Sequence, residues 1–219
     1  IMVVKFKKYL LVALACFLIV ILTFILGTFN PNFIKIKELE EKLETKIVSR
    51  LTTIDFYPPV FDTTDEISFV KSIEKCVNYL NFKIPPNERI PYILIAAQSS
   101  LESNFGTSRF AVEANNILGI RTYNKDDKQI KSKSNPNAEW GLKVFTTKCA
   151  CVDYYIKLLN NHNAYKKFRE SRIKQNNSGF IYPKKLAETL TSYASDQNYI
   201  PKVKKQIDYL IEILQNNAG

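Results

Sequence analysis

Glu102 is the residue whose position most directly suggests chemistry. It stands near the end of the apolar segment Ile90–Phe105, directly after Leu101, and Gly106 follows the segment. A carboxyl group held against apolar side chains has a raised pKa, because these surroundings disfavour its ionised form. Such a group can act as a general acid and protonate a departing glycosidic oxygen. From its surroundings alone, a solvated glutamate at the end of a helix is the more common case, so both interpretations stay open.

The cysteines and the single histidine suggest a different chemistry, that of a thiol nucleophile or a metal site. Cys149, Cys151 and His162 lie in one stretch of the chain. Two cysteines and one histidine lack the four-ligand spacing of a structural zinc site, and Cys149 fits the apolar face of a helix. Cys16 stands apart near the N-terminus, and the cysteine spacing indicates no disulfide framework. The sequence therefore predicts no metal and no organic cofactor.

The segment around Glu102 resembles the signature of the bacterial glucosaminidase family, and especially of its Bax-like members. The signature A-x-x-S-x-x-E-S-x-x-G-x-S-x-x-A-x-x-x-N-N-x-x-G is matched in order from Ala96 to Gly119. Residues 145–172 and 186–199 also resemble the Bax-like pattern, so the resemblance covers the chain from about Pro86 to its end. It implies a lysozyme-like domain that hydrolyses the β-1,4 bond after N-acetylglucosamine in peptidoglycan.

The resemblance also implies roles for single residues. Glu102 matches the family's catalytic acid, and Tyr193 matches a tyrosine needed for activity, with Tyr199 nearby. Tyr193 would stabilise positive charge on the sugar or orient its N-acetyl group, although an aromatic residue on a helical face is more often part of the core. Further matches imply residues that frame the sugar groove: Gln98, Ser108, Asn115 and Asn116.

A second carboxylate is harder to place. It should lie about 5 to 9.5 Å from the first, unless the substrate's acetamido group replaces it. The candidates are Asp126, Asp127 and Glu139. Glu139 stands roughly where related enzymes carry an acid on a hairpin, so we predict it as catalytic, with surface solvation as the alternative. Tyr123 and Trp140 lie in the same polar stretch, where an exposed ring could stack on a sugar; core packing is the alternative for both.

Helical periodicity dominates the segments that must position these residues. Pro91 and Gly106 suit the start and the end of the helix that carries Glu102. Polar residues prevail over residues 115–144, which predicts loops and a small hairpin. The expected fold is mainly α (α+β), a lysozyme-like helical domain with a small irregular or β-hairpin lobe. Apolar residues recur at helical spacing in residues 33–53, 67–80, 91–106, 145–159, 186–193 and 203–214.

The N-terminus carries an apolar segment long enough to cross a bilayer. Leu10–Phe29 contains no charged residue and approaches the ~20 residues that a spanning helix needs, and lysines precede it. We therefore expect a single-pass anchor over residues 1–29 in the cytoplasmic (inner) membrane and a helical stalk or packing segment over residues 30–84. The catalytic domain, residues 85–219, would face the periplasm or exterior. A cleaved signal peptide or a lipid anchor at Cys16 is the alternative.

Composition limits the classes of partner. A net charge of +10 favours polyanions, among them nucleic acid, acidic lipid and the carboxylate-bearing peptides of peptidoglycan. An exported domain would not meet nucleic acid, so peptidoglycan glycan strands are the expected partner. Two alternatives stay open: a lytic transglycosylase or muramidase on the same scaffold, and a non-catalytic wall-binding scaffold protein. The Asn-Asn-x-x-Gly and Tyr-Ala-Ser motifs favour the glucosaminidase.

Overall fold

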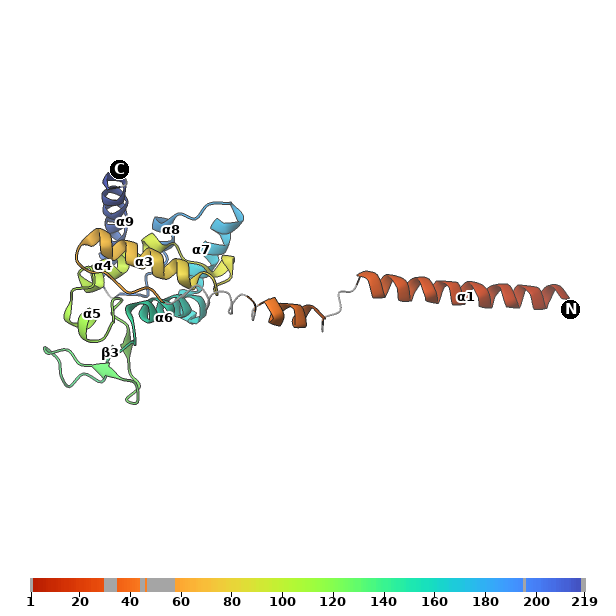
Figure 1. Cartoon of the computed structure of the whole chain (residues 1–219), viewed down its shortest axis with the longest axis horizontal. Helices are drawn as coiled ribbons and strands as arrows, with labels where there is room; N and C mark the ends of the chain where they lie inside the picture. Colours follow the sequence, from red (N-terminus) through yellow and green to blue (C-terminus); the bar gives the residue numbers. More distant parts are fainter. Residues whose placement is uncertain (1, 30–34, 44–45, 47–57, 195, 218–219) are drawn as a thin grey trace. The chain divides into compact units, whose positions relative to one another are not determined.

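The computed structural model of the chain describes residues 2–29, 35–43, 46, 58–194 and 196–217 (Figure 1). These residues belong to two compact units, Ile1–Tyr57 and Pro58–Gly219. In the first unit, α1 spans Met2–Phe29, and residues 35–43 are also helical. The second helical segment falls within the amphipathic helix predicted for residues 33–53, and the end of that prediction lies outside the described residues.

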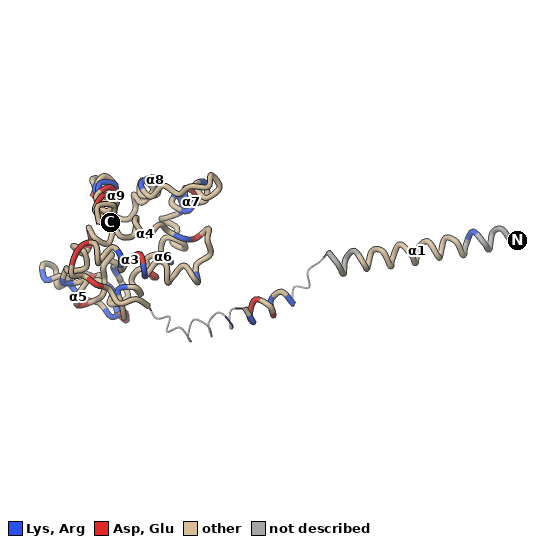
Figure 2. Tube along the Cα trace, turned by 45° about the horizontal axis from the view of Figure 1, so that its top comes forward, with Lys and Arg blue, Asp and Glu red and all other residues tan. Residues whose placement is uncertain are grey.

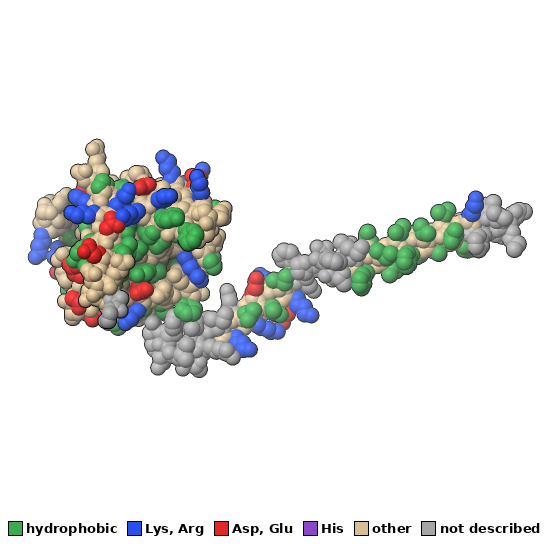
Figure 3. All heavy atoms as spheres, turned by 90° about the horizontal axis from the view of Figure 1, so that it is seen from above, with side chains coloured by type: hydrophobic (Ala, Val, Ile, Leu, Met, Phe, Trp, Pro, Cys, Tyr) green, Lys and Arg blue, Asp and Glu red, His purple; other side chains and the backbone are tan. Residues whose placement is uncertain are grey.

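The apolar segment near the N-terminus is helical and forms most of α1. Its described side chains from Tyr9 to Phe24 are exposed, and Figure 3 shows hydrophobic side chains along this helix. Among the residues that the structure describes, however, no helix is both long enough and apolar enough to cross a membrane. The transmembrane segment predicted over Leu10–Phe29 is therefore not supported.

The second unit is mainly helical, with one small sheet, which confirms the predicted fold class for this part of the chain. The three strands follow one another between α5 and α6, with helices before and after them. In chain order its elements are α3 (Glu66–Leu80), η1 (Pro86–Glu88), α4 (Tyr92–Ser103), α5 (Arg109–Glu113), β1 (Arg121–Thr122), β2 (Gln129–Ile130), β3 (Gly141–Lys143), α6 (Lys148–Asn161), η2 (Asn163–Tyr165), α7 (Lys166–Asn177), α8 (Pro183–Ala187) and α9 (Tyr199–Asn216).

Helix α4 is the central helix of this unit. Its sequence is almost entirely apolar or small, and most of its side chains are buried where it packs against α3, α8 and α9. The helix ends at Ser103, because Asn104 adopts the left-handed conformation with φ 49° and directs the chain away. The predicted end at Gly106 was therefore slightly too late. Burial of α4 fixes the position of Glu102, which stands in its last turn.

The lobe between α5 and α6 is a three-stranded antiparallel sheet with the order β1-β3-β2. Arg121 pairs with Leu142, and Ile130 pairs with the same residue from the other side. The sequence predicted a small hairpin here, and the pairing of β3 with both β1 and β2 adds a third strand. The short strands place residues 121–123 next to the end of α4.

A disulfide joins α3 to α6. Cys76 and Cys149 are bonded across a sequence separation of 73, with their Cα atoms 5.7 Å apart, and both are buried. The prediction of no disulfide framework was therefore wrong. Spacing along the chain could not show this pair, because it depends on α3 packing against α6. The predicted domain boundaries stay predictions, but α3 lies in the same compact unit as α4 and α6.

Basic and acidic residues are interspersed over the second unit (Figure 2). Lys204 binds Glu188 at 2.6 Å and Lys184 pairs with Asp208, so that ion pairs connect the region of α8 to α9. Exposed pairs of this kind each contribute about 0–1 kcal/mol to stability. Their main consequence is that they help to position α9, which begins with Tyr199, a residue of the predicted site.

Candidate active site

A groove of about 730 Å³ lies beside the last turn of α4. Its walls come from the end of α4, the loop before β1, the start of the sheet lobe, α6, η2 and the segment before α9. This arrangement brings Glu102, Tyr123 and Tyr193 of the predicted site together. The described residues that line it are Glu102, Leu118, Gly119, Ile120, Arg121, Tyr123, Tyr154, Leu158, Tyr165, Thr191, Ser192, Tyr193, Ala194 and Asp196.

Glu102 presents its carboxyl group to this groove. The side chain as a whole is exposed, but the carboxyl lies against the backbone of Gly119, close enough that a Cβ on Gly119 would be 3.1 Å from Oε2. Burial raises the pKa of the carboxyl, while a hydrogen bond from Tyr199 and the positive charge of Arg121 act to lower it. The balance is upward, which is the direction that a general acid requires.

A hydrogen-bonded chain behind Glu102 fixes its surroundings. Tyr155 donates to Oε1 of Gln98, and Nε2 of Gln98 donates to the hydroxyl of Tyr199 over 3.0 Å. Because Gln98 fills an acceptor site on that hydroxyl, the proton of Tyr199 is available for the Glu102 carboxyl. Gln98 and Tyr199 are both buried, and neither is among the described residues that line the groove. They were predicted to bind substrate, but their contacts are those of positioning residues.

Tyr193 lines the groove and also holds its wall. Its hydroxyl donates to the carbonyl of Leu118, in the loop that passes Glu102. Its ring stacks on Tyr199, with centroids 5.5 Å apart, and meets Tyr155 edge-on at 5.7 Å. Burial raises the pKa of Tyr193 well above its ordinary value, so the phenol stays neutral. A neutral phenol with one edge in the groove can orient a substrate but cannot act as a base at ordinary pH.

The remaining motif residues shape the loops around the groove. The side-chain amide of Asn116 donates to the carbonyls of Ile120 and Lys143, at 2.8 Å each, and its oxygen accepts from the amide N–H of Ile120. Asn115 binds backbone carbonyls before α6, and Ser108 caps α5. These three were predicted to frame the sugar groove. Their observed contacts fix the backbone of neighbouring loops, and none of them lines the groove among the described residues.

The sheet lobe does not bring the predicted second acids to the groove. Glu139 is exposed before β3 and is not among the described lining residues. Asp126 is exposed at a turn, and Asp127 binds Lys143 and Thr122 at 2.6 Å each, which lowers the pKa of its carboxyl. The prediction of a catalytic Glu139 thus has no geometric support in this conformation.

The two aromatic candidates in the lobe lie differently. Tyr123 lines the groove and is 67% exposed, so its ring is accessible to a sugar. Trp140 is half-buried, and the guanidinium carbon of Arg121 lies 4.0 Å from the centroid of its ring. Trp140 therefore contacts a groove residue, while its own ring is not among the described lining residues.

Asp196 is a groove carboxylate that sequence reasoning missed. It accepts hydrogen bonds from Lys202 at 2.7 Å and from the backbone N–H of Asn198 at 2.8 Å, and these lower the pKa of its carboxyl. Glu102 and Asp196 thus line one groove and have pKa values shifted in opposite directions. The available signal was its place between Tyr193 and Tyr199 in the matched motif.

Thiol and metal chemistry find no support in the described part of the chain. Burial raises the pKa of the Cys151 thiol to about 12, which makes it a poor nucleophile. Cys149 is bonded to Cys76 and therefore has no free thiol. Among the described residues, no group of three or more histidine, cysteine or acidic side chains could hold a metal ion.

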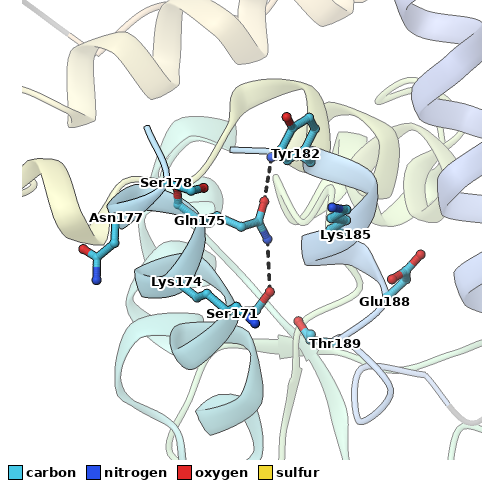
Figure 4. Close-up of a pocket in the computed structure, with 9 residues that line it drawn as sticks. All are labelled: Ser171, Lys174, Gln175, Asn177, Ser178, Tyr182, Lys185, Glu188 and Thr189. Carbon is cyan, nitrogen blue, oxygen red and sulfur yellow. Dashed lines mark hydrogen bonds between the residues drawn. The ribbon is translucent and has the colours of Figure 1, made fainter. Parts of the chain in front are cut away.

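A second pocket, of about 640 Å³, lies between α7 and α8 (Figure 4). There Gln175 donates to Ser171 within α7 and accepts from the backbone N–H of Tyr182, the residue before α8, so its amide links α7 to the start of α8. Glu188, the acid of this pocket, is paired with Lys204, which lowers the pKa of its carboxyl. An acid with a lowered pKa is a poor proton donor, so the groove at Glu102 is the better candidate active site.

The groove lies within a domain that matches a known protein family. The family described as mannosyl-glycoprotein endo-beta-N-acetylglucosaminidase matches residues 83–212, which contain all the groove residues named above. Protein bax of Escherichia coli (strain K12) is 28% identical over 131 residues, which cover 58% of this chain and 43% of that protein. The chain thus corresponds to less than half of that relative's length.

Two solved structures are similar. The catalytic domain of the autolysin Auto from Listeria monocytogenes has a TM-score of 0.50 at 19% identity, covering 79% of this chain and 94% of that domain. A glycoside hydrolase domain of FlgJ from Salmonella typhimurium has a TM-score of 0.47 at 18% identity, covering 68% of this chain and 99% of that chain. At 19% identity, the likeness to the autolysin domain shows a shared fold and nothing further.

Proposed function

Since the chain belongs to the mannosyl-glycoprotein endo-beta-N-acetylglucosaminidase family, we propose that it is a peptidoglycan hydrolase that cleaves the β-1,4 bond after N-acetylglucosamine. One observation carries the proposal. Glu102, in the family motif, directs a carboxyl group with a raised pKa into a groove that also holds the ionised Asp196. The family match over residues 83–212 supports a glycan as the substrate class.

The proposed reaction begins with Glu102 protonated. It donates this proton to the glycosidic oxygen as the bond from that oxygen to the anomeric carbon breaks, and positive charge develops on the sugar ring. Water then adds to the anomeric carbon and gives its proton to Glu102, which restores the starting state. If a second base accepts that proton instead, the base releases it to solvent and Glu102 takes up a proton from solvent before the next turnover. Tyr199 keeps the Glu102 carboxyl oriented through its hydrogen bond, while Tyr193 lines the sugar site.

Completion of the reaction needs either the substrate's own acetamido group or a second carboxylate. Asp196 lines the groove and is held ionised by Lys202, so it is the better placed carboxylate in the described structure. Glu139 remains a candidate only if the sheet lobe moves. Asp196→Asn and Glu139→Gln, assayed side by side, separate the two: loss of turnover in only one identifies the second acid, and full activity in both favours the acetamido group.

The central experiment uses the purified chain on peptidoglycan, with Glu102→Gln as its inactive partner. We expect the parent to release fragments and the variant to release none while keeping its circular dichroism spectrum and melting temperature. Mass spectrometry of the new ends decides between activities. Reducing N-acetylglucosamine ends support the glucosaminidase, N-acetylmuramic acid ends a muramidase, and anhydro ends a lytic transglycosylase. Absence of turnover by both proteins would favour the scaffold protein.

The proposed substrate places the site of action outside the cytoplasmic membrane, where peptidoglycan lies. The buried Cys76–Cys149 disulfide supports this, because such bonds form and persist in oxidising compartments. Alkylation of thiols in intact cells before lysis tests it. Protection of Cys76 and Cys149 as an oxidised pair is expected, and their recovery as free thiols from fresh cells would contradict it.

A further inference from the structure

Arg121 is a cation in the groove with a fixed orientation. It stands in β1, opposite Leu142 of β3, and its guanidinium carbon lies 4.0 Å from the ring centroid of Trp140. At this distance the guanidinium lies over the indole face, an attractive contact between a cation and an aromatic ring. Trp140 precedes β3, so the pairing of β1 with β3 sets the distance between the two side chains. The sheet therefore holds Arg121 at the edge of the groove.

The hydrogen-bonding edge of Arg121 is free within the described structure. Arg89, Arg109, Arg169 and Arg172 each donate to a carbonyl or side-chain oxygen of the protein. For Arg121 no hydrogen bond and no ion pair with a described residue is found, although its charge is near enough to lower the pKa of Glu102. A guanidinium that lines a groove, stacked on one face and without a described acceptor, is arranged to receive an acceptor from a ligand.

The chemistry of a guanidinium selects the ligand group. Its planar fork binds a carboxylate through two parallel N–H···O bonds, which neutral hydroxyl or acetamido groups cannot match. N-acetylglucosamine carries no charge, so in a peptidoglycan strand carboxylates occur only on the side arm of muramic acid. That arm ends either in a free lactyl carboxylate, once the peptide has been removed, or in the carboxylates of the attached peptide.

We infer, on the basis of the proposed function, that Arg121, oriented by Trp140, binds a carboxylate of the muramic acid side arm. This contact would make the groove prefer anionic glycan over neutral N-acetylglucosamine oligomers. Arg121 lines the same groove as Glu102, so the bound carboxylate would lie close to the bond being cleaved. A substrate anion on Arg121 would also offset the positive charge that favours the ionised form of Glu102. Substrate binding would then keep the general acid protonated to a higher pH.

Binding can be measured separately from turnover in the Glu102→Gln protein by calorimetry. Three soluble fragments serve as probes: a glycan with intact peptides, the same glycan stripped of peptides so that the lactyl carboxylate is free, and a neutral N-acetylglucosamine oligomer. Adding Arg121→Gln should weaken binding of an anionic fragment about tenfold or more and that of the neutral oligomer less than about twofold. Whichever anionic fragment loses more affinity identifies the carboxylate.

Two variants control for other roles of Arg121. Arg121→Lys keeps the charge but loses the fork, and should recover only part of the affinity for the anionic fragment. Arg109→Gln removes an arginine that is paired with Glu113 outside the groove, and should leave all three affinities unchanged. Equal weakening of anionic and neutral fragments by Arg121→Gln, or no weakening of either, would overturn the inference. If none of the fragments binds Glu102→Gln itself, the proposed function fails as well.

Discussion

Gly119 lies so close to Glu102 that a Cβ built on it would be 3.1 Å from Oε2 of the carboxylate. The backbone at Gly119 therefore forms one wall of the space that the carboxyl occupies. Its φ of 62° is a left-handed conformation that side-chain-bearing residues rarely adopt. Asn116 and Tyr193 hold the adjoining loop through hydrogen bonds to Ile120 and Leu118. The burial that raises the pKa of Glu102 thus depends on this loop.

We expect Gly119→Ala to lower the turnover of peptidoglycan roughly tenfold to a hundredfold, because the methyl group would displace the Glu102 carboxyl. It should also lower the free energy of unfolding by about 1–2 kcal/mol through the left-handed backbone. Gly179→Ala is the matched control, with φ 81° and open space around its Cβ position. It should lose similar stability, measured by urea denaturation, but keep its activity. Equal loss of activity in both variants would contradict a specific role for Gly119.

The hydrogen bond from Tyr199 predicts a pH effect. It favours the ionised form of Glu102, so Tyr199→Phe should raise the pKa of the carboxyl. Since the protonated form is the active one in the proposed mechanism, the alkaline limb of the kcat/KM profile should move to higher pH. Tyr209→Phe, which removes a hydroxyl bonded to Glu66 away from the groove, should leave the profile in place. An alkaline limb that does not move, or moves to lower pH, would argue against Tyr199 as the partner of Glu102.

Sequence reasoning located the active-site helix but not the direction of every side chain. The apolar pattern of α4 and the motif around Glu102 were sufficient to predict a helix that ends at an acid in a groove. Gln98 and Asn116 belong to the same motif, yet they bind other protein groups. A motif records which residues a fold needs, and it does not distinguish those that contact a ligand from those that hold a loop.

The features that were missed depend on contacts between distant segments. Arg121 faces the groove because β1 pairs with β3 in one register, and a shift by one residue would turn it to the other face. The Cys76–Cys149 bond requires that α3 pack against α6. None of these contacts follows from local spacing.

The disulfide predicts a redox-dependent stability. Reduction, or the double substitution Cys76→Ala with Cys149→Ala, should lower the free energy of unfolding by about 2–4 kcal/mol, because the bond closes a long loop in the unfolded chain. Urea denaturation with and without dithiothreitol measures the difference. Cys16→Ser leaves the bond intact and should retain the full response to reductant. A midpoint for the parent protein that does not respond to dithiothreitol under conditions that reduce the bond would contradict the prediction.

The burial that raises the pKa of Glu102 should also lower the stability of the folded protein at neutral pH. A carboxyl whose pKa is higher in the folded than in the unfolded state binds its proton more tightly when folded. Its favourable contribution to folding is complete below the ordinary glutamate range, near pH 4, and is lost as pH rises through the raised value. Glu102→Gln cannot ionise and so avoids this loss. The melting temperature of the variant minus that of the parent should therefore become more positive from about pH 4 to pH 8.

Glu188→Gln supplies a control of opposite sign. Lys204 lowers the pKa of the Glu188 carboxyl, so its contribution to folding is present above the ordinary range and disappears as pH falls through the lowered value. For this variant the difference in melting temperature should become more negative as pH rises from about 3 to 5, the range in which the Glu188 carboxyl ionises. Opposite signs of the change in this difference with pH would distinguish a carboxyl whose pKa is raised by burial from one whose pKa is lowered by an ion pair. Parallel slopes would mean that the groove does not hold the Glu102 proton, and the proposed general acid would have to be sought elsewhere.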